Sequence, residues 1–150
     1  MRNLDFIGVG AARSGTTWVS KMLSEHPNIY IPRRKELHYF NNDNDYQQNL
    51  KNYRPSFDMA PPNSIMGEYT PRYMINAIAM ERIAQHFPTA KIIMMLRNPI
   101  LRSYSQYRYF RNIKLRDTCP SFPHALEEKT FYEDYIAKSL YSSGVERVYE

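Results

Sequence analysis

Apolar residues in this 150-residue chain occur in short continuous runs, separated by segments in which they recur at helical spacing. The runs predict four strands, at residues 5–10, 28–32, 64–69 and 91–96. The last run, KIIMML, is apolar after its first residue, which is typical of a strand buried on both faces of a parallel sheet. The helical spacing predicts helices over 16–25, 71–87, 98–112, 121–129 and 132–150.

Strands that alternate with helices predict an α/β fold, a central parallel sheet covered on both faces in three α/β/α layers. At 150 residues the chain is expected to form a single domain, residues 1–150. A polar segment follows each predicted strand. Because ligands of parallel sheets gather at the carboxyl ends of the strands, we expect these four segments to converge on one cleft.

Three local features complete the predicted elements. The helix over 16–25 carries one apolar face, made of Trp18, Val19, Met22 and Leu23. Pro71 is expected in the first turn of the helix over 71–87, where its missing N–H costs nothing. Residues 42–63 are rich in Asn, Asp, Gln and Pro, and predict an irregular or weakly helical connection.

Charge and composition narrow the possible partners. The net charge of +5 and the pI near 9.3 favour an anion, such as a nucleotide, an acidic glycan, a nucleic acid or a membrane surface. Cys119 is the only cysteine, so no intrachain disulfide can form, and we expect a reducing, cytoplasmic location. No apolar run reaches about 18 residues, so we expect no integral membrane segment.

The stretch GVGAARSGTT, residues 8–17, has the glycine spacing of a phosphate-binding P-loop, G-x-x-x-x-G-K-[ST]. Thr16 stands where that motif has lysine, and Arg13 supplies a positive charge from inside the loop. A loop between a strand and a helix directs its free N–H groups at an anion. We therefore predict a P-loop-type fold with a phosphate site here. The alternative is a glycine-rich turn that only caps the helix.

Arg97 ends the most apolar predicted strand, at the position where a P-loop kinase usually has an acidic residue that helps to hold Mg²⁺. An arginine there suits an anion, so we predict a second anion site and no metal; an ordinary surface charge is the alternative. His26, His86 and His124 also lack metal-ligand spacing. A P-loop kinase of a small metabolite remains an alternative function.

Four motifs in order over residues 5–110 resemble the sulfotransferases that use 3′-phosphoadenosine-5′-phosphosulfate (PAPS), particularly the heparan-sulfate-type and related bacterial branch. They are GAARSGTTWVSKMLSEHPNI, KELHYF, GEYTPRY and KIIMMLRNPILRSYSQY. The resemblance implies that PAPS is the co-substrate and that the loop Arg13, Ser14, Gly15, Thr16 and Thr17 holds its 5′-phosphosulfate. It also implies that Arg97 and Ser105 bind its 3′-phosphate.

The same resemblance implies that Glu36, in K-E-x-H-x-F, is the catalytic base that takes a proton from an acceptor hydroxyl or amine. His38 lies on the same side as Glu36 if the segment is extended, and would orient the acceptor or assist proton transfer. The alternatives are a salt bridge from Glu36 to Lys35 or Arg34, and a structural histidine. With Glu36 and His38, Arg13 completes the predicted catalytic set, stabilising the leaving phosphate where the family usually has lysine.

Departures from the family pattern leave the acceptor open. Asn41 stands where heparan-type enzymes often have an acid, and Tyr69 where they have a lysine. The acceptor is expected to be a glycan or a small molecule, and the sequence does not indicate an oligomeric state. The family usually has further sequence that closes over the nucleotide, so the chain resembles an N-terminal part. An inactive nucleotide-binding fragment is therefore a further alternative.

The segment YSQYRYFRNIKLR, residues 104–116, mixes basic and aromatic residues in a way that also suits nucleic acid. We favour a solvated helix face whose tyrosines pack on the core, and expect no nucleic-acid partner.

Overall fold

The computed structural model describes residues 3–48, 50–112 and 120–149. Its strands are β1 (Phe6–Gly10), β2 (Ile29–Tyr30), β3 (Ile65–Tyr69) and β4 (Lys91–Met94). They form one sheet in the order β2-β3-β1-β4, and all of the pairs are parallel. The four predicted strands and the parallel sheet are confirmed, although β2 and β4 are shorter than expected.

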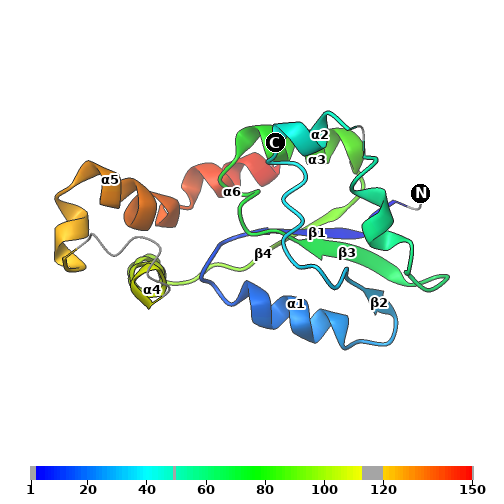
Figure 1. The fold of residues 1–150 in the computed structure, drawn as a ribbon, viewed down its shortest axis with the longest axis horizontal. Coiled ribbons are helices and arrows are strands. Elements are labelled where there is room, and N and C mark those ends of the chain that lie inside the picture. Colours follow the sequence, from blue (N-terminus) through cyan, green and yellow to red (C-terminus); the bar gives the residue numbers. More distant parts are fainter. Residues whose placement is uncertain (1–2, 49, 113–119, 150) are drawn as a thin grey trace.

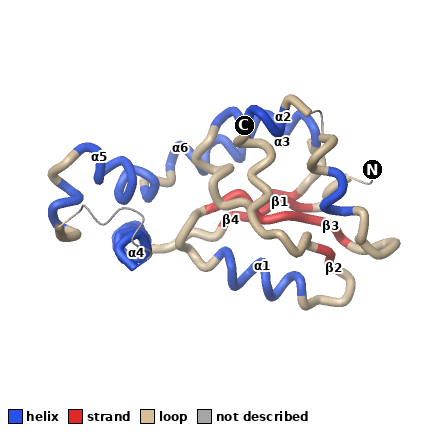
Figure 2. The backbone as a smooth tube through the Cα atoms, viewed as in Figure 1, coloured by secondary structure: helices blue, strands red, loops and turns tan. Residues whose placement is uncertain are grey.

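Helices cover both faces of the sheet, so the predicted three-layer arrangement is also confirmed (Figures 1 and 2). One face carries α1 (Thr16–Ser24), and the opposite face carries α3 (Ala77–His86) and α6 (Ser142–Tyr149). Beyond the carboxyl ends of the strands lie α4 (Pro99–Asn112) and α5 (Lys129–Phe131). The predicted irregular connection contains the short helix α2 (Asp43–Tyr46) and a 3₁₀ turn, Arg54–Phe57.

The main core lies between the sheet and α3, and β1 runs through its middle. Every residue of β1 is buried, and Ile7 and Val9 are fully enclosed. Gly8 lies directly against the ring of Tyr69 on β3, and a Cβ atom at this position would come within 2.3 Å of that ring. The close approach of β1 and β3 therefore needs a glycine at residue 8.

Two sequence predictions about helix and strand environment are wrong. Pro71 does not begin a helix, because the chain turns through residues 70–76 and Asn76 caps α3 by accepting the N–H of Ala79 at 2.9 Å. The strand β4 is not buried on both faces: Lys91 is exposed and the three residues after it are only half-buried. The reason is that β4 pairs with β1 alone and forms an edge of the described sheet.

The apolar face predicted for α1 is only partly buried, because Val19 and Leu23 are half-buried. Thr16 and Ser20 are the buried residues of this helix, whereas Trp18 is 66% exposed and Met22 is 48% exposed. Thr16 follows the loop directly and faces inward, so Ser20, one turn later, shares its side, and Trp18 and Met22 are rotated outward.

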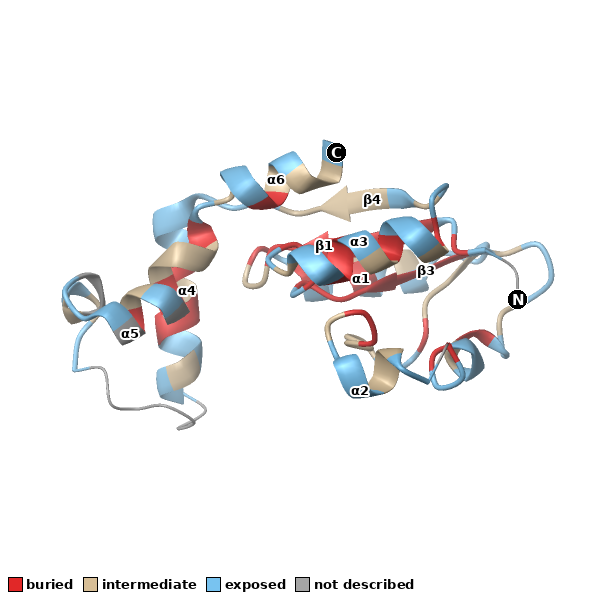
Figure 3. Cartoon of the chain, turned by 90° about the horizontal axis from the view of Figure 1, so that it is seen from above, coloured by how far each residue is buried: buried red, intermediate tan, exposed pale blue. Residues whose placement is uncertain are grey.

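Residues of α4 and of the C-terminal part form a second, smaller aromatic cluster of Tyr107, Phe131 and Tyr135. Figure 3 shows buried positions on α4 and α5, apart from the sheet. Here the predicted helices over 121–129 and 132–150 are divided into short pieces. These are a 3₁₀ turn at Pro123–Leu126, α5, a π-helical turn at Tyr132–Ile136, a 3₁₀ turn at Ala137–Ser139, and α6. Of the basic aromatic segment, Tyr107 packs inward while Tyr104 and Tyr109 are exposed. Cys119 and residues 113–116 lie outside the described residues.

Within the described parts of the chain, no helix is both long enough and apolar enough to cross a membrane.

Candidate functional site

The glycine loop leads from β1 into the first turn of α1. Gly15 precedes the helix with a φ of 88°, which strains any side chain, although a Cβ atom would meet no atom within 4 Å. No side chain caps the helix at this end. The hydroxyl of Ser14 is buried and has no hydrogen-bond partner among the described residues. The loop therefore offers unused donors at a helix N-terminus, the arrangement that binds an anion.

Three side chains from α4 and the segment before it contact this loop. Arg13 Nε donates to Ser105 Oγ at 3.4 Å, and the Arg13 guanidinium lies 4.3 Å from the centre of the Tyr109 ring. Arg97 Nη1 donates to the backbone carbonyl of Arg13 at 3.3 Å. The two predicted anion sites, distant in sequence, are therefore neighbours in the fold.

A cavity of about 710 Å³ joins these groups. Its walls include Gly15, Thr16, Thr17 and Ser105. Six basic side chains also line it: Arg13, Lys21, Arg72, Arg97, Arg102 and Lys138. Glu36 is the acidic residue in the same wall. Such an excess of positive charge in a concave site attracts a multiply charged anion.

Arg102 is the most buried of these basic residues, at 1% exposed. It donates through Nε to the Ser139 hydroxyl and through Nη2 to the Tyr135 carbonyl at 2.5 Å. Burial lowers its pKa from the ordinary arginine value. These contacts connect α4 to the C-terminal segment that carries Lys138 into the cavity.

Glu36 lies on the cavity wall with its side chain 39% exposed. One carboxylate oxygen is 2.6 Å from Lys35 Nζ and the other is 3.5 Å from His38 Nε2. The salt bridge considered as an alternative is therefore present, and Glu36 also faces the cavity. The segment is not extended, because Glu36 and His38 have φ values of 61° and 57°. The two side chains meet through left-handed backbone instead.

A second cavity, of about 500 Å³, adjoins the far side of His38. Asn41, Asn42, Asn44 and Asp43 line it, and Arg72 reaches both cavities. Asn41 Oδ1 is 3.3 Å from His38 Nδ1. The residue that replaces the family acid thus contacts the histidine directly.

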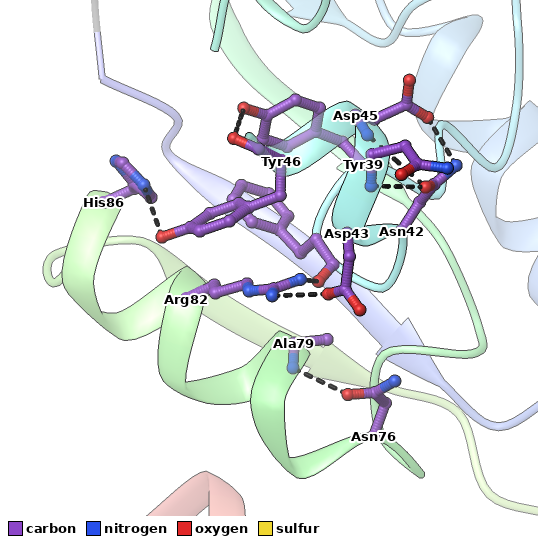
Figure 4. A network of polar contacts seen from close by, with 11 residues as sticks. Tyr39, Asn42, Asp43, Asp45, Tyr46, Asn76, Ala79, Arg82 and His86 are labelled. Carbon is purple, nitrogen blue, oxygen red and sulfur yellow. Dashed lines mark hydrogen bonds and ion pairs between the residues drawn. The ribbon is translucent and has the colours of Figure 1, made fainter. Parts of the chain in front are cut away.

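The chain after residue 40 is fastened to α3 (Figure 4). Arg82 donates to the carbonyl of Phe40 at 2.9 Å and to Asp43 Oδ1 at 2.6 Å. The hydroxyl of Tyr46 is 3.1 Å from His86 Nε2. Two side chains of α3, Arg82 and His86, therefore fix the position of the segment that lines the second cavity.

Glu68, which the sequence analysis did not single out, lies at the end of β3 behind the Glu36 segment. It is 1% exposed, and it accepts hydrogen bonds from Tyr53, Thr70 and Tyr73 at 2.9, 2.7 and 3.0 Å. Burial raises its pKa, and the hydroxyl donors partly oppose that rise. The glutamate in GEYTP is the feature of the sequence that could have indicated this network, because a charged residue that is buried at the end of an apolar strand needs hydrogen-bond partners.

Comparison with known proteins places the chain among sulfotransferases. The family described as "Sulfotransferase domain" matches residues 4–148. The membrane-associated sulfotransferase kil1 of Dictyostelium discoideum is 33% identical over 132 residues, covering 83% of this chain and 28% of that protein. The human heparan sulfate glucosamine 3-O-sulfotransferase 5 is 27% identical over 147 residues, covering 93% of this chain and 42% of that protein.

A solved structure, a sulfotransferase from Alicyclobacillus acidocaldarius, superimposes with a TM-score of 0.82 at 29% sequence identity. The alignment covers 98% of this chain and 68% of the other. The chain spans less than half the length of kil1 and of the human 3-O-sulfotransferase 5. The predicted resemblance and the predicted P-loop-type α/β fold are confirmed.

Proposed function

Because the chain belongs to the sulfotransferase domain family, we propose that it transfers a sulfuryl group from PAPS to an acceptor hydroxyl or amine. The observation that carries this proposal is the single cavity that joins the glycine loop, Arg97, Ser105 and Glu36. A donor with phosphate groups at both ends of an adenosine would place one group at each anion site.

In this proposal the loop Arg13, Ser14, Gly15, Thr16 and Thr17 holds the 5′-phosphosulfate. Arg97 and Ser105 hold the 3′-phosphate. Hydrogen bonds between charged groups are the stronger ones, and Arg97 and Arg13 offer several donors each. Since Arg13 already contacts Ser105, the same arginine would lie close to both ends of the donor.

Glu36 is the proposed base. The acceptor oxygen or nitrogen attacks sulfur and forms a new bond as the bond from sulfur to the phosphate oxygen breaks. The acceptor proton passes to Glu36, and the electron pair of the broken bond stays on the leaving phosphate, whose charge Arg13 stabilises. One carboxylate oxygen of Glu36 is paired with Lys35 at 2.6 Å, which leaves the other oxygen, 3.5 Å from His38 Nε2, to accept the proton.

The acceptor is proposed to be a glycan or a small molecule that enters from the second cavity. Three asparagine amides, Arg72 and His38 line this side, and such groups hydrogen-bond hydroxyl-rich ligands. The human relative described above is a heparan sulfate glucosamine 3-O-sulfotransferase, which makes heparan sulfate the first acceptor to test.

Calorimetric titration tests the donor assignment directly. We expect the chain to bind 3′,5′-bisphosphoadenosine without magnesium, and to bind it more tightly than ATP with Mg²⁺. Magnesium-dependent binding that favours ATP would instead support a P-loop kinase. Binding of the bisphosphate with no transfer to any acceptor would support a nucleotide-binding part without activity of its own.

A further inference from the structure

The backbone around the proposed base is strained on both sides of Leu37. Glu36 and His38 both adopt left-handed φ values, 61° and 57°. A non-glycine residue in this conformation costs on the order of 1–3 kcal/mol of folding free energy. Such a conformation persists only where surrounding contacts hold it. Residues 36–40, here called the base segment, contain no helix or strand. Hydrogen bonds from outside this segment must therefore fix it.

Those hydrogen bonds come from the end of β3 and the turn after it. The backbone amide of Leu37 faces the carboxylate of Glu68 and partly opposes the rise that burial causes in its pKa. The backbone amide of Phe40 faces the hydroxyl of Tyr73. That hydroxyl donates to Glu68 Oε1 at 3.0 Å. Glu68 and Tyr73 are 1% and 0% exposed. Water does not compete for these groups, so each lost partner leaves a buried donor unsatisfied.

The aromatic packing supports the same connection. The ring of Phe40 meets the rings of Tyr73 and Tyr53 at centroid distances of 5.6 and 5.2 Å. Arg82 holds the carbonyl of Phe40 from the other side at 2.9 Å (Figure 4). The base segment is thus held at the ring and the carbonyl of Phe40, and its Leu37 and Phe40 amides face Glu68 and Tyr73.

We propose that Glu68 and Tyr73 are positioning residues that hold the base segment, and through it Glu36 and His38, against the cavity. This inference rests on the proposed function, since it assigns Glu36 a catalytic role. Neither Glu68 nor Tyr73 lines the main cavity, so they act through Leu37 and Phe40 and do not touch the substrate.

Tyr53 offers a matched control. Its hydroxyl donates to the same Oε1 atom of Glu68, at 2.9 Å, and it is 1% exposed. Tyr53→Phe and Tyr73→Phe each remove one hydroxyl from that oxygen and keep the ring. Of the two hydroxyls, only that of Tyr73 also faces the backbone amide of Phe40. A role in stability alone would make the two variants alike.

The test combines hydrogen exchange by NMR with kinetics on the same chain, with heparan sulfate as the acceptor probe. Glu68→Met keeps an unbranched side chain without acceptors, and should speed exchange of the Leu37 amide relative to the amides of β1. Its kcat should fall about 10- to 100-fold through misplacement of Glu36, while affinity for 3′,5′-bisphosphoadenosine stays unchanged. Tyr73→Phe should speed exchange at Phe40 and lower kcat less, and Tyr53→Phe should do neither.

Equal effects of Tyr53→Phe and Tyr73→Phe on exchange and kcat would overturn the proposal, as would a Leu37 amide that Glu68→Met leaves unchanged. If Glu68→Met does not fold, the tyrosine pair decides the question. If the unaltered chain transfers no sulfuryl group but Leu37 exchange responds to Glu68→Met, the proposed function fails and the positioning contact stands.

Discussion

The donor side of the cavity and the wall behind the base segment use their polar groups in opposite ways. On the donor side, the helix end at Gly15 has no side-chain cap and the Ser14 hydroxyl has no partner among the described residues. Behind the base segment, the Glu68 carboxylate accepts hydrogen bonds from three hydroxyls. The donor side is partly open, with Arg97 exposed, whereas Glu68 is enclosed.

This difference separates two tasks. An anion site must keep donors and positive charge available, and the ligand itself supplies the missing partners. A base must already have the correct position when the acceptor arrives, since fixed groups need no reorganisation during the reaction. The chain places unsatisfied groups where a ligand is proposed to bind and satisfied ones where a side chain must be held.

The largest expected effect comes from Glu36→Gln, which keeps the shape of the side chain and removes the proton acceptor. A positioned base contributes about 10²–10⁴-fold, so kcat should fall by about that factor while 3′,5′-bisphosphoadenosine binds as before. Steady-state kinetics and calorimetry measure the two quantities. Glu25→Gln is the control, because Glu25 also pairs with a lysine, Lys21 at 3.8 Å, but lies outside the cavity. If turnover is unaltered in Glu36→Gln, the role of Glu36 is limited to its salt bridge with Lys35.

A smaller effect is expected from Arg97→Ala on the donor side. Hydrogen bonds to charged groups contribute about 1.5–3 kcal/mol, so the affinity for 3′,5′-bisphosphoadenosine should fall about 10- to 150-fold. Adenosine 5′-monophosphate, which lacks the 3′-phosphate, should lose much less. Arg108→Ala, an exposed arginine on α4, the helix that follows Arg97, is the control and should leave both affinities unchanged. A similar loss for both nucleotides would indicate that Arg97 acts by supporting the Arg13 carbonyl.

These two regions also differed in how far the sequence predicted them. The donor side follows from local pattern, because a glycine loop after a strand and a basic residue after another strand meet wherever parallel strands end together. Arg97 and Arg13 are 84 residues apart in sequence and form a hydrogen bond. The strands, the parallel sheet and the three layers were predictable for the same reason.

The wall behind the base segment was not predictable in this way. No spacing rule encodes the left-handed backbone at Glu36 and His38, and the buried Glu68 and Tyr73 proposed to hold it come from another part of the chain. The orientation of α1 depends on how Thr16 enters the helix, so its apolar face alone misleads. The exposure of β4 depends on its place at the edge of the sheet. Each of these features is decided by long-range packing.

Tyr69 joins the two regions and gives the smallest expected effect. It is 1% exposed, and its hydroxyl donates to the carbonyl of Gly10, where the glycine loop begins, at 3.2 Å. Tyr69→Phe should lower the free energy of unfolding by about 1 kcal/mol at pH 7, the value of one hydrogen bond. Chemical denaturation of both proteins measures the difference.

The pH dependence of that difference identifies the buried hydroxyl. Burial raises the pKa of Tyr69 from 10.0 to about 12, so the folded state favours the neutral phenol. The contribution of Tyr69 is therefore complete below pH 10, and it is lost as the pH rises through about 12. The difference in the free energy of unfolding between the unaltered chain and Tyr69→Phe should shrink across this range, although other tyrosines titrate in both proteins. If this difference stays constant to the highest pH measured, the Tyr69 hydroxyl is not buried against Gly10. The contact between β3 and the glycine loop would then need another explanation.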